Sequence, residues 1–226
     1  MKFVSWNVNG IRSCLNQGLE KFFRDESPDF FSIQEIKCNE ESFKPKGYKT
    51  FYNFSKIKGY SGTAVLTKYT PLSLYFDNDG RIISLEYDRF YFINVYVPNS
   101  KDGVVKKDYR SGWEDKFKEY LSSLVKPIIL CGDFNSGYEN INLSFLDENK
   151  DFLCNLIDEF DLIDTFRVFH PNEKVYTWKS IKNKGAGSRI DYFLISKYFA
   201  KNLKGARIYS NTEGSDHLPI GISLEL

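Results

Sequence analysis

The apolar run at residues 127–131 constrains the fold most, because it stops at a glycine that is followed by two short polar side chains. Residues 128–131 read Ile-Ile-Leu-Cys after Pro127. Such a short, unbroken and partly β-branched run favours a strand buried on both faces. Gly132 permits a turn or a close backbone contact, so Asp133 and Asn135 are expected together at the carboxyl end of this strand. In layered α/β sheets, ligands bind at that end.

Other apolar runs are also bordered by polar side chains. Asp and Asn after a glycine are ordinary turn residues that hydrogen-bond their own backbone, and for one segment alone that explanation is sufficient. The runs at 3–6, 30–34, 92–95 and 218–220 adjoin, in turn, Asn7 and Asn9, Glu35, Tyr96 and Asn99, and the pair Asp216-His217. Polar groups at several strand ends predict one convergent site.

Size and composition indicate one intracellular domain. The 226 residues, 42% of them apolar, are compatible with a single domain over residues 1–226. A net charge of +1 gives no global field that steers nucleic acid, so DNA binding would need a local basic patch. The four cysteines show no CxxC pair or zinc spacing. Without a signal peptide or a membrane-length apolar run, we expect a cytoplasmic monomer with no membrane contact and no obligate protein partner.

The spacing of apolar residues predicts the fold class. Helical spacing occurs at 15–23, 113–124 and 152–160, and strands are expected at 48–54, 62–66, 72–76, 82–87, 90–97, 175–178, 189–195, 206–209 and 220–224. Turn residues between the strands from 48 to 97 predict an antiparallel meander. Because strands come both in hairpins and separated by helices, we expect a four-layer α/β sandwich. In it, two mainly antiparallel β-sheets pack face to face with helices outside.

The polar set suits a hard cation. Mg²⁺ prefers oxygen ligands and is commonly held by one or two carboxylates. Such a set is supplied by Glu35, Asp133, Asp216, Asn7 and Asn135. One histidine in the cluster and no paired cysteines argue against zinc. The absence of G-x-S-x-G, P-loop and G-x-G-x-x-G motifs argues against serine hydrolase, P-loop and dinucleotide-binding chemistry.

Asp191 stands inside an apolar segment, between Ile190 and residues 192–195. A buried carboxylate is costly without a partner. We hypothesise that Asp191 fixes the tautomer of His217, and a salt bridge with Arg189 or another nearby base is the equal alternative. A hydrogen-bonded structural role would explain His217 taken alone, but the whole set favours phosphodiester hydrolysis.

Six short motifs carry a resemblance to a known family. They are SWNVNG at 5–10, QEIK at 34–37, VYVPN at 95–99, GDFN at 132–135, RIDY at 189–192 and SDH at 215–217. They resemble, in order and over nearly the whole chain, the signatures of the exonuclease III and abasic-site endonuclease family. This resemblance implies a four-layer sandwich of the endonuclease/exonuclease/phosphatase superfamily that acts on double-stranded DNA with Mg²⁺ or Mn²⁺.

The resemblance also implies roles. Glu35 would be the principal metal ligand, with Asn7 and Asp216 close by. Asp133 would orient or deprotonate the attacking water, and Asn135 would hold Asp133 or the scissile phosphate. Both residues are also expected to be metal ligands.

The remaining catalytic roles concern an imidazole and a phenol. His217, backed by Asp191, would polarise a phosphate oxygen or act as the base, so the base is Asp133 or His217. Tyr96 would contact the phosphate. Water would attack in line and leave a 3′-hydroxyl.

DNA contacts are expected from two basic loops, 101–110 and 179–189, for which a solvated surface is the alternative. Arg110 is the first choice and Asn99 the second, and Asn9, Trp178 and Lys101 complete the set.

The chain departs from the family pattern where the substrate would be chosen. Ser188 stands where the abasic-site enzymes usually carry Trp, and Ser136-Gly137-Tyr138, with Asn142 further on, replace Val-Ala-His and an acid. The expected function is a DNA repair phosphodiesterase, a 3′ to 5′ exodeoxyribonuclease or an abasic-site endonuclease or both. The alternatives are a non-specific nicking endonuclease, a phosphatase of the same superfamily, or a catalytically silent DNA-binding module.

Overall fold

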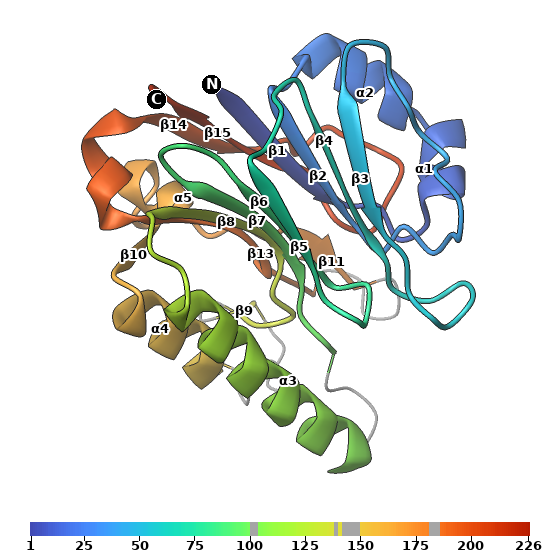
Figure 1. Cartoon of the computed structure of the whole chain (residues 1–226). Coiled ribbons are helices and arrows are strands. Elements are labelled where there is room, and N and C mark those ends of the chain that lie inside the picture. Colours follow the sequence, from blue (N-terminus) through green and yellow to red (C-terminus); the bar gives the residue numbers. More distant parts are fainter. Residues whose placement is uncertain (100–103, 138–139, 142–149, 181–185) are drawn as a thin grey trace.

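The computed structural model describes residues 1–99, 104–137, 140–141, 150–180 and 186–226. Two six-stranded sheets pack face to face, and helices lie on their outer faces (Figure 1). This arrangement confirms the predicted four-layer α/β sandwich. Among the described residues, no helix has the length and apolar character needed to cross a membrane.

The first sheet has the strand order β14-β15-β1-β2-β4-β3. Its strands are β1 (Lys2–Asn7), β2 (Phe30–Gln34), β3 (Lys49–Asn53), β4 (Thr63–Thr67), β14 (Leu203–Ile208) and β15 (Ile220–Leu224). Only β1 and β2 pair in parallel among these neighbours. Their carboxyl ends, at Asn7 and just before Glu35, therefore meet at one edge.

The second sheet has the order β10-β13-β8-β7-β6-β5. Its strands are β5 (Ser73–Phe76), β6 (Ile82–Glu86), β7 (Tyr91–Tyr96), β8 (Ile128–Asp133), β10 (Leu162–Asp164) and β13 (Asp191–Ser196). Here β7 and β8 form the parallel pair, in register from Tyr91 with Ile128 to Tyr96 with Asp133. The expected buried strand thus delivers Asp133 beside the end of β7. A small third sheet joins β11 (Trp178–Lys179), β12 (Gly187–Ser188) and β9 (Asn140–Ile141).

Three apolar clusters separate the layers. Aromatic side chains such as Phe3, Phe30 and Phe92 fill the space between the sheets. The first sheet is covered by α1 (Ile11–Asn16) and α2 (Leu19–Glu26), and the second by α3 (Val104–Ser122) and α4 (Lys150–Glu159). The short α5 (Thr165–Phe169) and a 3₁₀ helix (Lys197–Asn202) complete the described elements. Because both faces of each sheet are covered, a functional site would form at the carboxyl ends of the strands.

Two predictions at the level of elements were wrong. The single helix expected at 15–23 is two helices, because Gly18 lies between them with a φ of 113°, a conformation that only glycine adopts readily. The antiparallel meander expected from 48 to 97 is divided between the sheets: β3 and β4 pair in the first, and β5, β6 and β7 in the second. Hairpin signals alone do not say which sheet a strand joins.

Gly132 has no room for a side chain. Its φ is 139°, and a Cβ would lie 1.9 Å from the carbonyl oxygen of Val95 on the neighbouring strand. We expect Gly132→Ala to lower the free energy of unfolding by roughly 2–5 kcal/mol through overpacking and backbone strain. Chemical denaturation measures this loss. Gly205→Ala is the control, because a Cβ there meets nothing within 4 Å. Equal stability of the two variants would contradict this explanation.

Candidate active site

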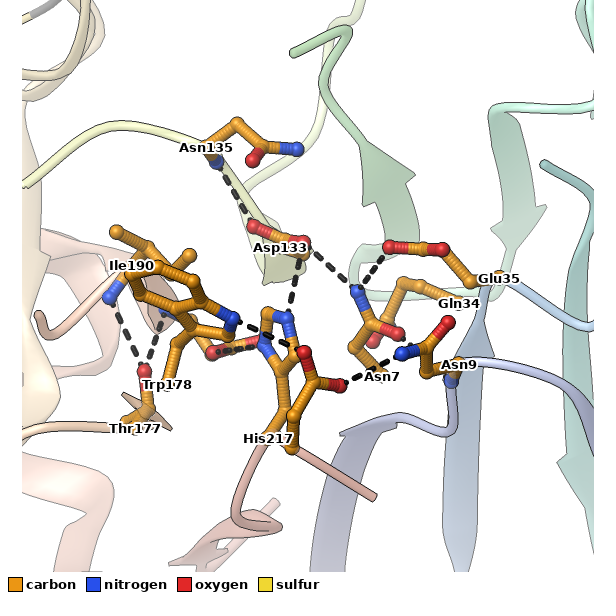
Figure 2. A network of polar contacts seen from close by, with 12 residues as sticks. Asn7, Asn9, Gln34, Glu35, Asp133, Asn135, Thr177, Trp178, Ile190 and His217 are labelled. Atoms are coloured by element: carbon orange, nitrogen blue, oxygen red, sulfur yellow. Dashed lines mark hydrogen bonds and ion pairs between the residues drawn. The ribbon is translucent and has the colours of Figure 1, made fainter. Parts of the chain in front are cut away.

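Asn7 connects the carboxylates at the ends of two other strands. Its Nδ2 donates hydrogen bonds to Glu35 Oε1 at 2.9 Å and to Asp133 Oδ2 at 2.8 Å (Figure 2). Asn7 and Asp133 are buried, and Glu35 is partly accessible. Residues that are far apart in the sequence, two from the first sheet and one from the second, thus meet in one place, as the polar strand ends predicted.

His217 lies between two carboxylates. Its Nδ1 is 2.9 Å from Asp191 Oδ2, and its Nε2 is 3.9 Å from Asp133 Oδ2. The alternative partner of Asp191 is engaged elsewhere, because the Arg189 guanidinium bonds to both carboxylate oxygens of Asp164, one of them at 2.6 Å. The structure therefore contains the Asp191–His217 contact that we hypothesised.

Neighbouring side chains orient this pair. Thr177 Oγ1 accepts hydrogen bonds from the backbone N–H groups of Ile190 and Asp191 at 3.0 and 3.1 Å. Trp6 Nε1 donates to the carbonyl oxygen of His217 at 2.9 Å. These bonds hold the backbone on both sides of the imidazole. The sequence offered no signal for the role of Thr177.

The combined effect of burial and neighbouring charges raises the pKa values of both Asp133 and His217. Burial raises the pKa of Asp133 to about 7, the nearby Asp191 carboxylate adds to the rise, and His217 opposes it. Burial alone would lower the pKa of His217, but the Asp191 carboxylate and, more weakly, Asp133 and Asp216 raise it to about 10. Near neutral pH, the site therefore holds an imidazolium beside a carboxyl group that titrates.

Replacing Asp191 with Asn tests the origin of the charge on His217. The lost carboxylate leaves burial as the main influence, so the pKa of His217 should fall from about 10 by several units. In the wild-type protein, the Asp191–His217 pair makes its full contribution to the free energy of unfolding below about pH 6.5. This contribution is lost as pH rises toward 10. Proton NMR titration of the metal-free protein measures the pKa of His217. An unchanged His217 pKa would assign the shift to other groups.

Three residues of the site have a strained backbone. Asn9, Glu35 and Asn135 have φ values of 45°, 53° and 45°, in the left-handed region that non-glycine residues seldom occupy. Each such residue costs on the order of 1 kcal/mol. All three residues follow the end of a strand, and the packing of the folded sandwich compensates for the strain.

Asn135 and Asp216 border the centre. Asn135 donates its backbone N–H to Asp133 Oδ1 at 2.8 Å and its Nδ2 to the carbonyl oxygen of Val97 at 2.9 Å. Asp216 accepts from Asn9 Nδ2 at 2.9 Å and from Trp178 Nε1 at 3.1 Å. In this arrangement Asn135 orients Asp133, and Asp216 fastens two residues at the rim.

Lys37 and Arg81 contact the site but were not among the predicted residues. Lys37 Nζ pairs with Glu35 Oε2 at 2.7 Å and also bonds Asn9 Oδ1. Burial alone would raise the pKa of Glu35. The Lys37 ammonium group and the hydrogen bond from Asn7 outweigh burial and hold this pKa below its usual range. Arg81 is buried, stacks 4.8 Å from the Tyr96 ring and donates to the Tyr96 carbonyl at 3.1 Å. The sequence signal for a role of Lys37 in the site was its position two residues after Glu35.

Tyr96 is buried at the end of β7. Burial and then the Glu35 and Asp133 carboxylates raise its pKa well above the ordinary value. Its hydroxyl therefore stays protonated and is available as a hydrogen-bond donor.

Arg110, the first choice for a DNA contact, is buried. Its side chain is 2% exposed, and it donates to the carbonyl oxygens of Pro98, Phe134 and Asn135 at 3.0, 3.3 and 2.9 Å. It also pairs with Glu114 at 2.6 Å. Arg110 thus ties the loops after β7 and β8 to α3, and it does not face a ligand.

The other predicted DNA-binding residues differ in accessibility. Asn9 is exposed, and Asn99 and Trp178 are partly buried. Residues 101–103 of the first loop, Lys101 among them, and residues 181–185 of the second lie outside the described residues. Residues 104–110 are not a loop but belong to α3. Ser188 is buried in β12 opposite Trp178, whereas Tyr138 and Asn142 also lie outside the described part of the chain.

Comparisons with known proteins show the family of this chain. The model of the endonuclease/exonuclease/phosphatase family matches residues 4–217. The chain is 37% identical over 257 residues to a DNA-(apurinic or apyrimidinic site) endonuclease of Dictyostelium discoideum, covering all of this chain and 71% of that protein. It is 32% identical over 253 residues to an exodeoxyribonuclease of Bacillus subtilis (strain 168), covering both completely.

Solved structures show the same relationship. A 3′-5′ exonuclease from Neisseria meningitidis superposes with a TM-score of 0.88 and 25% identity, over 100% of both chains. An AP endonuclease from Archaeoglobus fulgidus superposes with a TM-score of 0.84 and 27% identity, again over 100% of both chains. The chain therefore belongs to the endonuclease/exonuclease/phosphatase family and, within it, to the group of exonuclease III and abasic-site endonucleases.

Proposed function

We propose that this protein is a metal-dependent DNA phosphodiesterase of DNA repair, a 3′ to 5′ exodeoxyribonuclease or an abasic-site endonuclease or both. One observation carries the proposal: Asp191, His217, Asp133, Asn7 and Glu35 form a continuous polar chain along the edge where β1, β2 and β8 end and β13 begins. The relatives named as exodeoxyribonuclease and abasic-site endonuclease support DNA as the substrate.

The donor atoms fit a divalent cation. Glu35, Asp133 and His217 offer ligand atoms within 4.8 Å of one another. Glu35 Oε2 already binds the Lys37 ammonium group, so this oxygen attracts positive charge. Carboxylate and amide oxygens suit Mg²⁺ or Mn²⁺, which Glu35 would hold with help from Asn7, Asp216, Asp133 and Asn135. When bound, the ion would neutralise charge on the phosphate.

The protein's own side chains support a division of roles. Asp133, with a pKa near 7, is suited to take a proton from the attacking water, and the backbone N–H of Asn135 orients it. His217, charged through Asp191, would stabilise negative charge on a phosphoryl oxygen, and the Tyr96 hydroxyl would donate a hydrogen bond to the phosphate. In-line attack then leaves a 3′-hydroxyl.

Three labelled duplexes test the proposal: one intact, one nicked and one with an abasic site, each with and without Mg²⁺. A ladder of products from the nick indicates exonuclease action, and a single cut beside the lesion indicates endonuclease action. Binding in EDTA without cleavage after Mg²⁺ is added would instead support a catalytically silent DNA-binding module. Gel filtration tests the proposed monomer, and localisation in the cytoplasm remains a prediction.

Ser188 favours a second candidate, a change of substrate within the same chemistry. A buried serine opposite Trp178 cannot supply the aromatic ring that the abasic-site enzymes usually carry at this position. A Neisseria protein described as a 3′ phosphatase bound to product DNA hairpin superposes with a TM-score of 0.87 at 25% identity. A fourth duplex with a 3′-phosphate end therefore belongs in the assay. Rapid phosphate release with slow cutting at all other substrates would favour the phosphatase.

A further inference from the structure

A cavity lies on the flank where α5 contacts β14. Its volume is about 350 Å³, within the range of pockets that hold small ligands. Phe166, Ile208 and Leu218 supply apolar surface, and Tyr176, which is 36% exposed, adds an accessible aromatic ring. The cavity therefore offers surface to a flat, partly apolar group.

The same cavity carries unbalanced positive charge. Lys174 and Lys179 line it from the segment before and within β11, and Arg207 lines it from β14. None of these cations forms an ion pair with a carboxylate among the described residues, and the one carboxylate of the cavity, Glu173, pairs with His170 at 2.9 Å. A cavity with cations around an apolar surface suits a ligand that carries both a negative charge and a ring.

This cavity and the active site share a wall. Lys179 donates its backbone N–H to the carbonyl oxygen of Asp216 at 3.1 Å, and Leu218 donates to the carbonyl oxygen of Thr177 at 2.6 Å. Trp178 donates a hydrogen bond to Asp216 on the side of the active site. Tyr176 and Lys179, close to Trp178 in the sequence, line the cavity. A strand of DNA that leaves the active site over Trp178 would reach the cavity directly.

We propose that this cavity binds an unpaired nucleotide of the DNA substrate, an inference that rests on the proposed function. The phosphate lies among Lys174, Lys179 and Arg207, and the base lies against Tyr176 and the apolar floor. A base paired within a duplex cannot enter, so a blunt duplex does not place its phosphate among these cations. The cavity thus makes the enzyme prefer DNA with single-stranded nucleotides next to the point of cleavage.

Binding measurements on the full chain test this preference. Fluorescence anisotropy in EDTA, which prevents metal-dependent hydrolysis, compares a blunt duplex with the same duplex carrying a short single-stranded tail at its 3′ or its 5′ end. The test variant is Lys174→Ala/Arg207→Ala, in which both side chains are exposed, so the fold is retained. The matched control is Lys116→Ala/Lys201→Ala, which removes the same charge from exposed positions elsewhere.

The wild-type protein should bind one tailed duplex more tightly than the blunt one. The test variant should lose about tenfold in affinity for that tailed duplex and stay within about twofold on the blunt one, while the control keeps the preference. No tail preference in the wild type, or equal losses in both variants, would overturn the inference. Cleavage of the blunt duplex with Mg²⁺ then still supports the proposed nuclease, whereas its absence refutes the nuclease itself.

Discussion

Replacing Asp133 with Asn is expected to slow DNA cleavage at least about a thousandfold while DNA affinity stays within about twofold. Asn has nearly the same shape, and its oxygen can still accept one of the two hydrogen bonds that Asn7 and Asn135 donate. It cannot take a proton from water. The loss should therefore appear in kcat, measured by single-turnover cleavage at saturating Mg²⁺, and not in the binding constant measured in EDTA.

The matched control for this prediction is Asp25→Asn. Asp25 is an exposed carboxylate on α2, paired only with Lys21, and the substitution makes the same chemical change on the outer layer. Turnover of the control should equal that of the wild type. If Asp133→Asn also turned over within tenfold of the wild type, Asp133 would not be the group that accepts the proton, and the role would pass to His217.

The convergence of the site was predictable because it follows from local patterns. Runs of apolar residues indicated buried strands, and a polar residue after each run marked where that strand ended. Asn7 and Glu35 follow neighbouring parallel strands of one sheet, and Tyr96 and Asp133 end the parallel pair of the other. Parallel neighbours place their carboxyl ends at the same edge, so the residues within each pair meet there, and the face-to-face packing of the two sheets brings the two pairs together.

Long-range packing explains what could not be predicted. Arg110 follows a polar loop, and its charge suggested a surface, yet three carbonyl oxygens at the ends of β7 and β8 bury it. Those carbonyl groups come from distant segments that only the folded chain brings together. The same reason divides the strands from 48 to 97 between two sheets, because sheet membership depends on partners far away in the sequence.

Replacing His217 with Ala is expected to slow cleavage by about three orders of magnitude, since it removes the imidazolium beside Asp133. The chain contains one other histidine, so His170→Ala is a matched control and should keep normal turnover. The deletion also leaves a space next to the buried Asp191 carboxylate, into which added imidazole can bind. Partial recovery of cleavage with imidazole would show that the ring itself, rather than the fold around it, was lost.

The pH dependence of this recovery separates the two possible roles of His217. If the ring acts as a cation, recovery at subsaturating imidazole follows the imidazolium concentration and decreases as pH rises through about 6.5. If the ring acts as the base, recovery follows neutral imidazole and increases over the same range. We expect the decrease, because Asp191 keeps the imidazole of the native protein protonated well above neutral pH. An increase would assign proton removal to His217 and leave Asp133 to orient the water.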